Sequence, residues 1–525
     1  MSSIRLNHLR TVAFIGVCAG LLTSNGFAQN PIGYNQTYRP QYHFSPQKNW
    51  TNDPNGPVYF EGEYHLFFQY NPFGDVWGHM SWGHAVSPDL VHWKELPVAL
   101  AEEGGVMIFT GTTVVDRHNS SGFCQGAKPC LVAIYTGHTP ANGTAKALQT
   151  QNLAFSNDRG NTWTKYQGNP VLNLNMSDFR DPDVFWSESA KRWIMAVSLP
   201  DDHKIRFYGS ANLRSWQQLS DFGPAGAVSG QWECPDLVAM PVDGNPQKTR
   251  WVLKVGLNPG ALQGGSGEQY FVGQFDGTRF INENPGSLTL WSDYGKDCYC
   301  ALTFNDLPQT NKPVMIGWMN NWQYANKVPT SPWRGQMTLP REISLKTFPE
   351  GIRLVQTPPE AVARLDANHH RWNAGSTAKV NEGIAREPIR SHSFRLSANF
   401  GIGNSENLGL KLFAKGATYT LIGFDRNRKE LYVDRTHSGR TSFSKDFPAR
   451  VAAPLRIDSA KLRLDIFADH DSVEVFADGG HIVLTNLVFP EENAYGLETF
   501  SSNPDSTVEL EAWTLRSIWP GLSPH

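Results

Sequence analysis

Three acidic residues stand in unusually similar surroundings. Asp53 lies in "WTNDPNG", Asp181 in "FRDPDVFW" and Glu233 in "WECPDL", so each has an aromatic residue nearby and a proline one or two positions later. Proline stiffens the chain and can fix a carboxylate at the end of a strand. For any one of them alone, a structural role is the simpler interpretation. Because 128 residues separate Asp53 from Asp181 and 52 separate Asp181 from Glu233, they meet only if separate sheets converge on one axis.

Three convergent carboxylates suit the cleavage of a glycosidic bond. This reaction uses a carboxylate nucleophile and a carboxylic acid that protonates the leaving oxygen, around a transition state that resembles an oxocarbenium ion. A third carboxylate can hold sugar hydroxyls. From neighbours in sequence, we expect Trp232 to provide the apolar surroundings that keep Glu233 protonated, and Arg180 to hold Asp181 ionised.

The residues after Asp53 have the composition of a tight turn. In Asp53-Pro54-Asn55-Gly56, aspartate suits the first turn position, proline pre-sets the second, and Asn-Gly tolerates the positive φ that follows. The sequence therefore predicts that a turn holds Asp53 at the end of a strand.

Short strands joined by turns dominate the first part of the chain. Hairpins are expected over 57–71 and 183–199, where aromatic strands flank a polar turn. A weak repeat places Ser-x-Asp or Ser-x-Asn before a tryptophan, beginning at Ser87, Ser156 and Ser210. The copies lie about fifty to seventy residues apart, which fits one four-stranded sheet per repeat, as in the blades of a β-propeller. We expect a five-bladed β-propeller catalytic domain over 39–346.

The character of the chain changes after residue 346. A linker is expected over 347–370, which contains Pro358-Pro359 and a short alanine-rich segment. Beyond it, alternating apolar and polar residues predict an antiparallel β-sandwich over 371–520. The predicted fold class is all-β. Of the 17 tryptophans, 14 precede residue 346; some could stack on sugar rings, although most are expected to fill the cores between sheets.

Composition and the N-terminus limit the partners. Lys and Arg number 46 and Asp and Glu 49, a net charge of −3 without a basic run, so nucleic acid is not an expected partner. Residues 1–28 have the pattern of a signal peptide, with Arg5, Arg10, an apolar stretch and small residues before position 29. We therefore expect a secreted protein, extracellular or periplasmic, that has no membrane contact after cleavage.

The cysteines and histidines do not form a recognisable metal motif. Cys124 and Cys130 could pair in an oxidising compartment, whereas Cys298 and Cys300 are too close in sequence to bond comfortably to each other, and Cys234 is left over. His79, His84 and His92 also lie close together, but at these spacings they are expected to be ordinary hairpin residues. We predict neither a metal nor a cofactor.

The three acidic motifs, in this order and spacing, resemble the three signature motifs of glycoside hydrolase family 32, the β-fructosidases that include invertases, inulinases and levanases. The resemblance extends through "QYHFSPQKNW", "WGHAVSPDLVHW", "GWMNNWQY" and "SVEVFADGGH", nearly the whole chain after the expected signal peptide. It implies a five-bladed propeller followed by a β-sandwich. Thr51, Cys298 and Cys300 depart from the residues usual in that family, but none of these departures removes a carboxylate.

The resemblance also implies roles. Asp53 would be the nucleophile that forms a fructosyl-enzyme intermediate, and Glu233 the general acid and then the base that activates water. Asp181 would bind fructose hydroxyls and stabilise the transition state. The anomeric configuration would be retained, with about 5 Å between the nucleophile and acid carboxyl groups. The implied substrate-binding residues are Asn52, Gln69, Trp77, Phe109, Thr110, Arg180 and Trp333.

The leading hypothesis is a β-fructosidase that removes terminal fructose from inulin, levan or sucrose, and fructose-containing oligo- and polysaccharides are the expected partners. A fructosyltransferase that builds fructo-oligosaccharides from sucrose and a strict invertase are the alternatives, since the same intermediate serves all three. A non-catalytic carbohydrate-binding propeller would be expected to lack one of the carboxylates. The sequence leaves the oligomeric state and the role of the sandwich open.

Overall fold

The computed structural model describes residues 33–308, 312–457, 460–519 and 521, and from Tyr34 onward they belong to one unit. The expected signal peptide, 1–28, lies outside the described residues. Strands form most of the described chain, so the all-β prediction is confirmed. None of its helices has the length and apolar character needed to cross a membrane.

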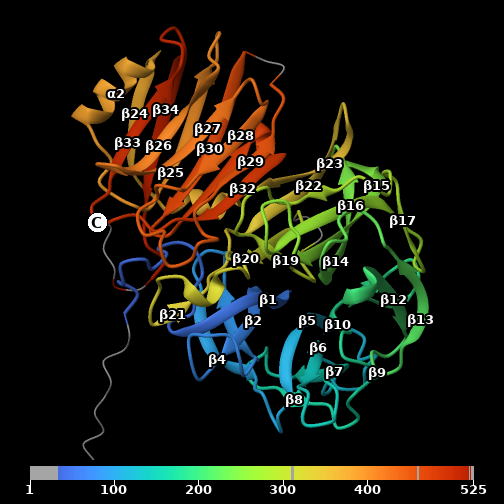
Figure 1. Cartoon of the computed structure of the whole chain (residues 1–525). Helices are drawn as coiled ribbons and strands as arrows, with labels where there is room; N and C mark the ends of the chain where they lie inside the picture. Colours follow the sequence, from blue (N-terminus) through green and yellow to red (C-terminus); the bar gives the residue numbers. More distant parts are fainter. Residues whose placement is uncertain (1–32, 309–311, 458–459, 520, 522–525) are drawn as a thin grey trace, which may run out of the picture. The chain divides into compact units, whose positions relative to one another are not determined.

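The strands of the first three sheets follow one another in sequence and pair antiparallel, apart from β21 in the first sheet (Figure 1). The first contains β1 (Asn49–Phe60), β2 (Glu63–Asn71), β3 (Ser81–Ser87) and β4 (Lys94–Leu100), with β21 (Trp333–Arg334) parallel to β1. The second contains β5 (Met107–Asp116), β6 (Cys130–Thr139), β7 (Leu148–Ser156), β8 (Thr164–Lys165) and β9 (Leu172–Met176). The third contains β10 (Arg180–Ser187), β11 (Arg192–Leu199), β12 (Lys204–Ser210) and β13 (Gln217–Phe222), with the 3₁₀ turn η1 (Pro200–Asp202) between β11 and β12.

Two further sheets complete the first domain, and a single residue pair, Val242 with Leu345, links them edge to edge. The fourth contains β14 (Gln231–Val242), β15 (Asn245–Asn258), β16 (Gly267–Phe275), β17 (Phe280–Asn282) and β18 (Leu290–Trp291). The fifth contains β19 (Tyr299–Thr303), β20 (Val314–Trp318), β22 (Arg341–Phe348) and β23 (Gly351–Thr357), with the 3₁₀ turn η2 (Ala325–Lys327) before β22.

The first strand of each sheet lies innermost. β1 contacts β5, β5 contacts β10, β10 contacts β14, β14 contacts β19, and β19 contacts β1 again, so the five strands form a closed ring. This arrangement is a five-bladed β-propeller, as predicted. Apolar clusters fill the spaces between neighbouring blades, and they contain the fully buried Trp82 and Trp232.

The Ser-x-Asp repeat is one turn used in three blades. In each copy the serine hydroxyl approaches the Asp or Asn two residues later, whose side chain accepts backbone N–H groups further along. Asp89 accepts from Val91 and His92, and Asp158 accepts from Thr162. Asn212 repeats the pattern in the third blade with the two residues before Trp216. The hydrogen bonds confirm that the sequence repeat marks equivalent positions.

The segment between the domains differs from the prediction. Of the residues 347–370 that we expected to be linker, 351–357 form β23, which pairs along its whole length with β22 in the fifth blade. Four consecutive buried residues of β23, Arg353 to Gln356, explain why the strand belongs to the blade and not to an exposed linker. Only the short helix α1 (Glu360–Ala363) and the residues around it connect the propeller to β24 (Asp366–Ser376).

The second domain consists of two antiparallel sheets that share one apolar core, as expected of a β-sandwich. One sheet contains β24, β25 (Phe394–Gly401), β30 (Lys461–Asp469), β31 (Ser472–Ala477), β32 (Ile482–Leu487) and β34 (Thr507–Leu515). The other contains β26 (Asn407–Lys415), β27 (Thr418–Asp425), β28 (Glu430–Asp434), β29 (Arg450–Pro454) and β33 (Gly496–Ser501). Helix α2 (Thr377–Arg386) follows β24, and the 3₁₀ turn η3 (Asp478–Gly480) follows β31.

A buried network of charged groups joins the domains. His43 lies between Asp469, 2.8 Å from Nδ1, and Glu474, 3.0 Å from Nε2, and Arg341 binds Glu474 at 2.5 Å. Burial alone would lower the pKa of His43. Hydrogen bonds that the protonated ring donates to its two acidic partners outweigh this effect and raise the pKa to about 9.

Candidate active site

Each innermost strand of the propeller carries a bulge near its start, and the predicted catalytic residues lie at three of these bulges. The register shifts between Thr51 and Pro54 in β1, between Arg180 and Asp183 in β10, and after Glu233 in β14. The same occurs in β5 and β19. A bulge redirects a side chain that would point to one face of the sheet in a regular strand. The ring of strands thereby brings Asp53, Asp181 and Glu233, from three of the five blades, close together.

The expected turn at Asp53-Pro54-Asn55-Gly56 is therefore wrong, because these residues belong to β1. Two register shifts, on either side of Asn55, accommodate the proline and the glycine within the strand. Gly56 has φ of +43°, and a Cβ there would lie 2.3 Å from the Thr113 hydroxyl of β5. Turn-forming residues occur here because the strand is bulged and closely approached by its neighbour.

Asp53 is 9% exposed, and Thr110 Oγ1 donates a hydrogen bond of 3.0 Å to its Oδ2. Its Oδ1 is without a hydrogen-bond partner in the described part of the chain. Burial raises the pKa of Asp53 to about 7, and the negative charges of Asp181 and Glu233 act in the same direction. The raised pKa of Asp53 therefore reflects its burial first and the nearby carboxyl groups second.

Glu233 is held by two donors. Arg180 Nε donates to its Oε1 at 3.0 Å, and the Tyr299 hydroxyl donates to its Oε2. Arg180 is itself fixed by Asp178, which accepts from Nη1 at 2.7 Å, and by Gln231, which accepts from Nη2 at 2.7 Å. The carboxyl group of Glu233 is therefore oriented by groups from β10 and β19, the innermost strands of the blades on either side.

The carboxylate of Asp181 receives one backbone donor and no hydrogen bond from the Arg180 guanidinium among the described residues. The Cys234 N–H donates to its Oδ2 at 3.0 Å, and its own N–H donates to Thr136 Oγ1 at 2.9 Å. Arg180 lowers the pKa of Asp181, as predicted, but burial is the larger influence, and the Glu233 charge adds to it, so the pKa rises to about 7. Arg180 therefore acts on Asp181 in the expected direction, but burial and the Glu233 charge outweigh it.

Trp232 does not face Glu233. Its indole is fully buried between the third and fourth blades, where it packs on Phe222 and Phe271 and donates to the Ala227 carbonyl. Successive residues of a strand point to opposite faces, so an aromatic residue adjacent in sequence shields the other side. Tyr299, which the sequence analysis missed, is the aromatic residue that contacts Glu233.

Of the other predicted substrate-binding residues, Asn52 and Gln69 are buried, whereas Trp77 is exposed. Asn52 is buried next to Asp53, where it accepts from Trp50 Nε1 at 2.7 Å, and Gln69 is buried opposite Trp82 on β3. Trp77 is 41% exposed, and its ring lies edge-on to Phe109, 6.1 Å between centroids.

Trp333 is not brought to a surface that a sugar could reach. It is 0% exposed, and the guanidinium of Arg39 lies 3.5 Å from its ring centroid. This face of the Trp333 ring therefore contacts the guanidinium cation of Arg39.

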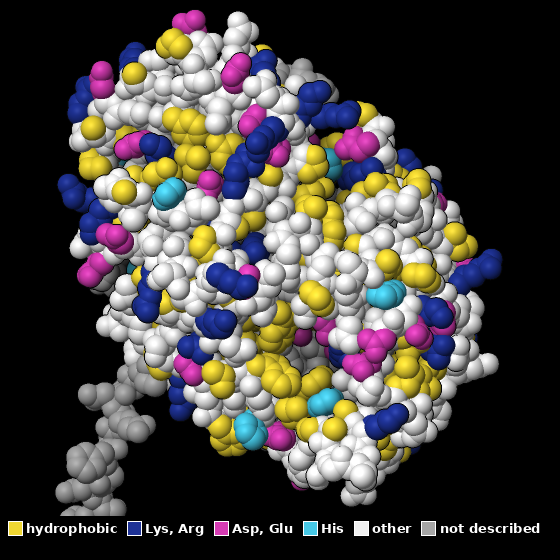
Figure 2. All heavy atoms as spheres, in the orientation of Figure 1, with side chains coloured by type: hydrophobic (Ala, Val, Ile, Leu, Met, Phe, Trp, Pro, Cys, Tyr) yellow, Lys and Arg dark blue, Asp and Glu magenta, His cyan; other side chains and the backbone are white. Residues whose placement is uncertain are grey.

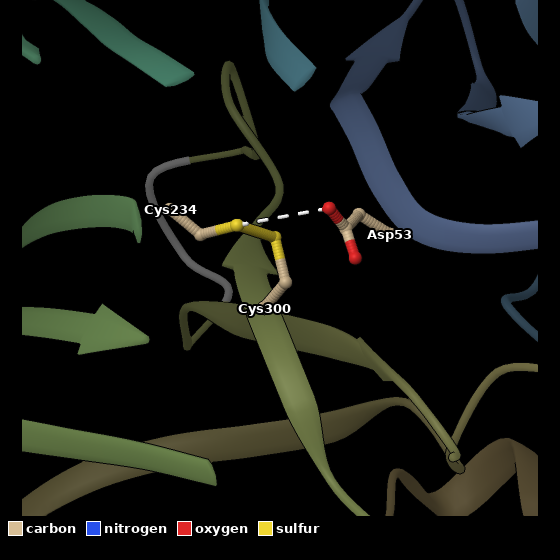
Figure 3. Close-up of side chains that lie close together, drawn as sticks. All are labelled: Asp53, Cys234 and Cys300. Atoms are coloured by element: carbon tan, nitrogen blue, oxygen red, sulfur yellow. Dashed lines mark hydrogen bonds between the residues drawn. A yellow bond between two sulfur atoms is a disulfide. The ribbon is translucent and has the colours of Figure 1, made fainter. Parts of the chain in front are cut away.

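A disulfide that the sequence analysis did not predict lies beside Asp53. Cys234 bonds to Cys300. The pair that the sequence allowed, Cys124 with Cys130, is also formed, and Cys298 is the unpaired cysteine among the described residues. Figure 3 shows Cys234 Sγ directed at Asp53, 3.9 Å from Oδ2. A disulfide sulfur carries no hydrogen, so this is a contact and not a hydrogen bond. Both sulfurs are bonded to each other and are not thiolates, so these three residues do not fit a metal site.

The molecular surface is hollowed where the innermost strands meet in Figure 1, and acidic and hydrophobic side chains gather around the hollow (Figure 2). Two cavities of about 550 and 270 Å³ lie elsewhere and share Arg117 and Asp306 in their walls. Neither is lined by a predicted site residue.

A five-bladed propeller with three carboxylates gathered at bulges of its innermost strands, followed by a β-sandwich, defines a class of glycoside hydrolases. Residues 43–358 match the N-terminal domain of glycosyl hydrolases family 32, and residues 361–514 match the C-terminal domain of that family. The chain belongs to glycosyl hydrolase family 32.

Known relatives and a solved structure resemble the chain over most of its length. A levanase of Bacillus subtilis is 45% identical, over 94% of this chain and 72% of the relative. An extracellular exo-inulinase of Aspergillus awamori is 41% identical, over 93% of this chain and 96% of the relative. The crystal structure of the exo-inulinase from Aspergillus awamori matches with a TM-score of 0.85 and 39% identity, over 93% of this chain and all of that one.

Proposed function

We propose that this protein hydrolyses terminal β-D-fructofuranosyl residues of fructans and of sucrose, with retention of configuration. The observation that carries the proposal is the convergence of Asp53, Asp181 and Glu233, with Glu233 oriented by Arg180 and Tyr299. The similar levanase and exo-inulinase support fructans as the substrate class. Export from the cell is part of the proposal and is supported by the extracellular relative.

Asp53 attacks the anomeric carbon as the nucleophile. Its Oδ1 is without a hydrogen-bond partner in the described residues and is therefore the oxygen available for bond formation, while Thr110 holds Oδ2. Glu233 protonates the leaving oxygen and then removes a proton from the water that cleaves the intermediate. Asp181, fixed by the Cys234 N–H, accepts hydrogen bonds from fructose hydroxyls.

The gathering of negative charge has a function in this scheme. The transition state carries positive charge on the sugar, and it is stabilised by buried carboxylates whose orientation is already fixed. Before the sugar binds, the same carboxylates repel one another, which contributes to the raised pKa of Asp53 and of Asp181. Substrate binding with developing cationic character relieves this repulsion.

The test is a time course on sucrose, inulin and levan that resolves fructose from oligosaccharides, with NMR of the first anomer released. We expect free fructose, released initially as the β-anomer, from the wild type. Asp53→Asn and Glu233→Gln should each lower kcat by at least about 10³-fold. A matched control is Asp116→Asn, since that buried aspartate lies in the β5–β6 region and binds loop N–H groups.

Each outcome separates the hypotheses. An inactive wild type on all three substrates would contradict the proposal. Accumulation of longer oligosaccharides at high sucrose concentration would favour the fructosyltransferase. Cleavage of sucrose alone would indicate a strict invertase.

A further inference from the structure

Cys234 contacts or adjoins all three carboxylates of the site. It follows Glu233 in the chain, its N–H donates to Asp181 at 3.0 Å, and its sulfur lies 3.9 Å from Asp53 (Figure 3). It is 1% exposed and has φ of +47°, a conformation that residues with a side chain rarely adopt. Something must hold this conformation, because otherwise the N–H would not stay directed at Asp181.

Its partner occupies an equivalent place on the neighbouring strand. Cys300 follows Tyr299, whose hydroxyl donates to Glu233, and Cys300 also has a positive φ, +48°. Both cysteines lie at bulges, Cys234 in β14 and Cys300 in β19. The disulfide therefore joins two blades at the residues that follow the proposed acid and its tyrosine donor.

The disulfide also determines what Asp53 can bond to. Its Oδ2 accepts from Thr110, and its Oδ1 is unpartnered among the described residues. A cysteine thiol at position 234 would carry a hydrogen that could be donated to the Asp53 carboxylate. A hydrogen bond to the ionised form stabilises it and weakens it as a nucleophile. In the disulfide this donor does not exist.

We propose that the Cys234–Cys300 disulfide is a positioning element of the active site. It holds the two bulges so that Glu233 stays on the Tyr299 hydroxyl and the Cys234 N–H stays on Asp181, and it withholds a thiol donor from Asp53. The inference rests on the proposed fructosidase function and assigns to the disulfide a role in the rate of the reaction as well as in stability.

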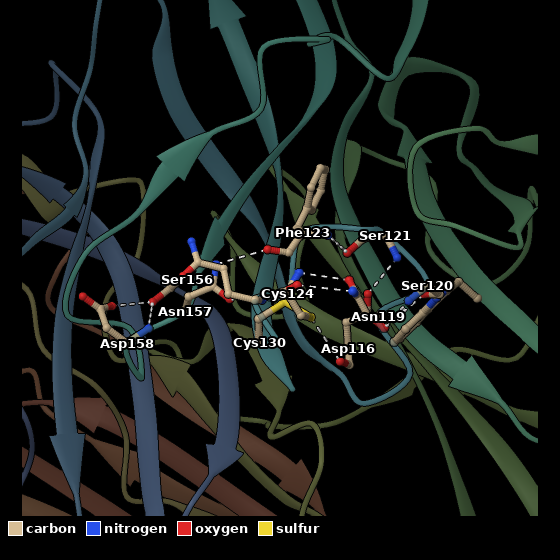
Figure 4. Close-up of a disulfide and its surroundings, with 12 residues drawn as sticks. Asp116, Asn119, Ser120, Ser121, Phe123, Cys124, Cys130, Ser156, Asn157 and Asp158 are labelled. Carbon is tan, nitrogen blue, oxygen red and sulfur yellow. Dashed lines mark hydrogen bonds between the residues drawn. A yellow bond between two sulfur atoms is a disulfide. The ribbon is translucent and has the colours of Figure 1, made fainter. Parts of the chain in front are cut away.

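The second disulfide provides a matched control. Cys124 lies in the connection between β5 and β6, and Cys130, six residues later, is the first residue of β6. Figure 4 shows them among Asp116, Asn119 and Phe123, a loop network in which the side-chain Oδ1 of Asn119 accepts the Cys124 N–H at 2.9 Å. None of the three carboxylates of the site is drawn there or bonded to this loop. Its removal tests the loss of a cross-link alone.

The experiment compares C234A/C300A with C124A/C130A. For each we measure kcat and KM on sucrose across the pH range, together with Tm. We expect C234A/C300A to lose at least tenfold in kcat with KM changed less than threefold, and its acid limb of kcat/KM to move. We expect C124A/C130A to keep kcat and the acid limb while Tm falls. The titratable groups that face Asp53 are Asp181, Glu233 and Tyr299.

A third variant isolates the donor. C234S/C300A lacks the disulfide but carries a hydroxyl beside Asp53, so its acid limb should lie at lower pH than that of C234A/C300A. If the two limbs coincide, withholding a donor is not part of the role of the disulfide.

If the double variants do not fold, native wild type is treated with a water-soluble phosphine, and the two disulfides are followed by mass spectrometry. The phosphine takes up the oxygen of water, and the two sulfurs take its hydrogens, giving two thiols and a phosphine oxide. Activity should fall in step with reduction of Cys234–Cys300 and not of Cys124–Cys130. An inactive wild type would overturn both proposals. An active wild type whose kcat and pH profile survive loss of Cys234–Cys300 would overturn only this one.

Discussion

Thr110→Val tests how the site controls its nucleophile. The change preserves shape and removes the hydroxyl that donates to Asp53 Oδ2 at 3.0 Å. A hydrogen bond to a charged group contributes about 1.5–3 kcal/mol. At 1.36 kcal/mol per pKa unit, its loss should raise the pKa of Asp53, already about 7, by about 1–2 units. The group acts ionised, so activity at low pH should fall further while activity at high pH is retained.

The assay is kcat/KM on sucrose from pH 4 to pH 9.5. In the variant the acid limb should move to higher pH by about 1–2 units, with a loss of about 10- to 100-fold well below the limb and little loss above it. Because the pKa values of Asp53 and Asp181 are both raised and the two groups are close neighbours, the limb belongs to the pair. The control is Thr113→Val, the same change on the same strand at a hydroxyl without a hydrogen-bond partner in the described residues. An acid limb that stays in place while kcat/KM falls equally at every pH would refute the reasoning.

Three further predictions follow from the geometry. Because its folded pKa is raised, His43 should stabilise the fold fully below its unfolded pKa of about 6.5 and lose this contribution as pH rises through about 9. In His43→Gln, the free energy of unfolding measured in urea should depend less on pH between these two values. An unchanged pH dependence would contradict this prediction. Trp77→Ala, at a 41% exposed ring, should raise KM for inulin about 2- to 10-fold with kcat nearly unchanged, and an unaltered KM would remove it from the site. Trp333→Phe should lower the free energy of unfolding by about 1–2 kcal/mol through the lost contact with Arg39 and leave KM for sucrose unchanged, whereas a raised KM would return it to the site.

Much of the architecture could be predicted because it is encoded locally. The Ser-x-Asp turn is made by hydrogen bonds within a few residues, as at Asp89 and Asp158, so it leaves a pattern in the sequence. Alternating burial along sandwich strands such as β25 and β34 does the same. The three carboxylates were also predictable, since a distinctive motif surrounds each of them.

The features that could not be predicted depend on contacts between distant segments. Cys234 pairs with Cys300 across 66 residues because two blades become neighbours in the ring. Tyr299 meets Glu233 for the same reason. Trp333 resembles a residue available to substrate, but Arg39, nearly three hundred residues earlier in the chain, covers its ring. Each depends on how the propeller closes, and single-sequence patterns contain little information on that.

The error at Asp53-Pro54-Asn55-Gly56 shows how this propeller makes a site. Turn residues and bulge residues share a chemistry, because both need proline, positive φ and small side chains. A turn would carry the chain away from the axis, whereas a bulge lets β1 continue into its blade while Asp53 points to the end of the ring. The same reasoning applies to Asp181, which has φ of +64° within β10. The site is therefore built from irregularities inside the most buried strands, where packing on both faces fixes the carboxylates more rigidly than a surface loop could.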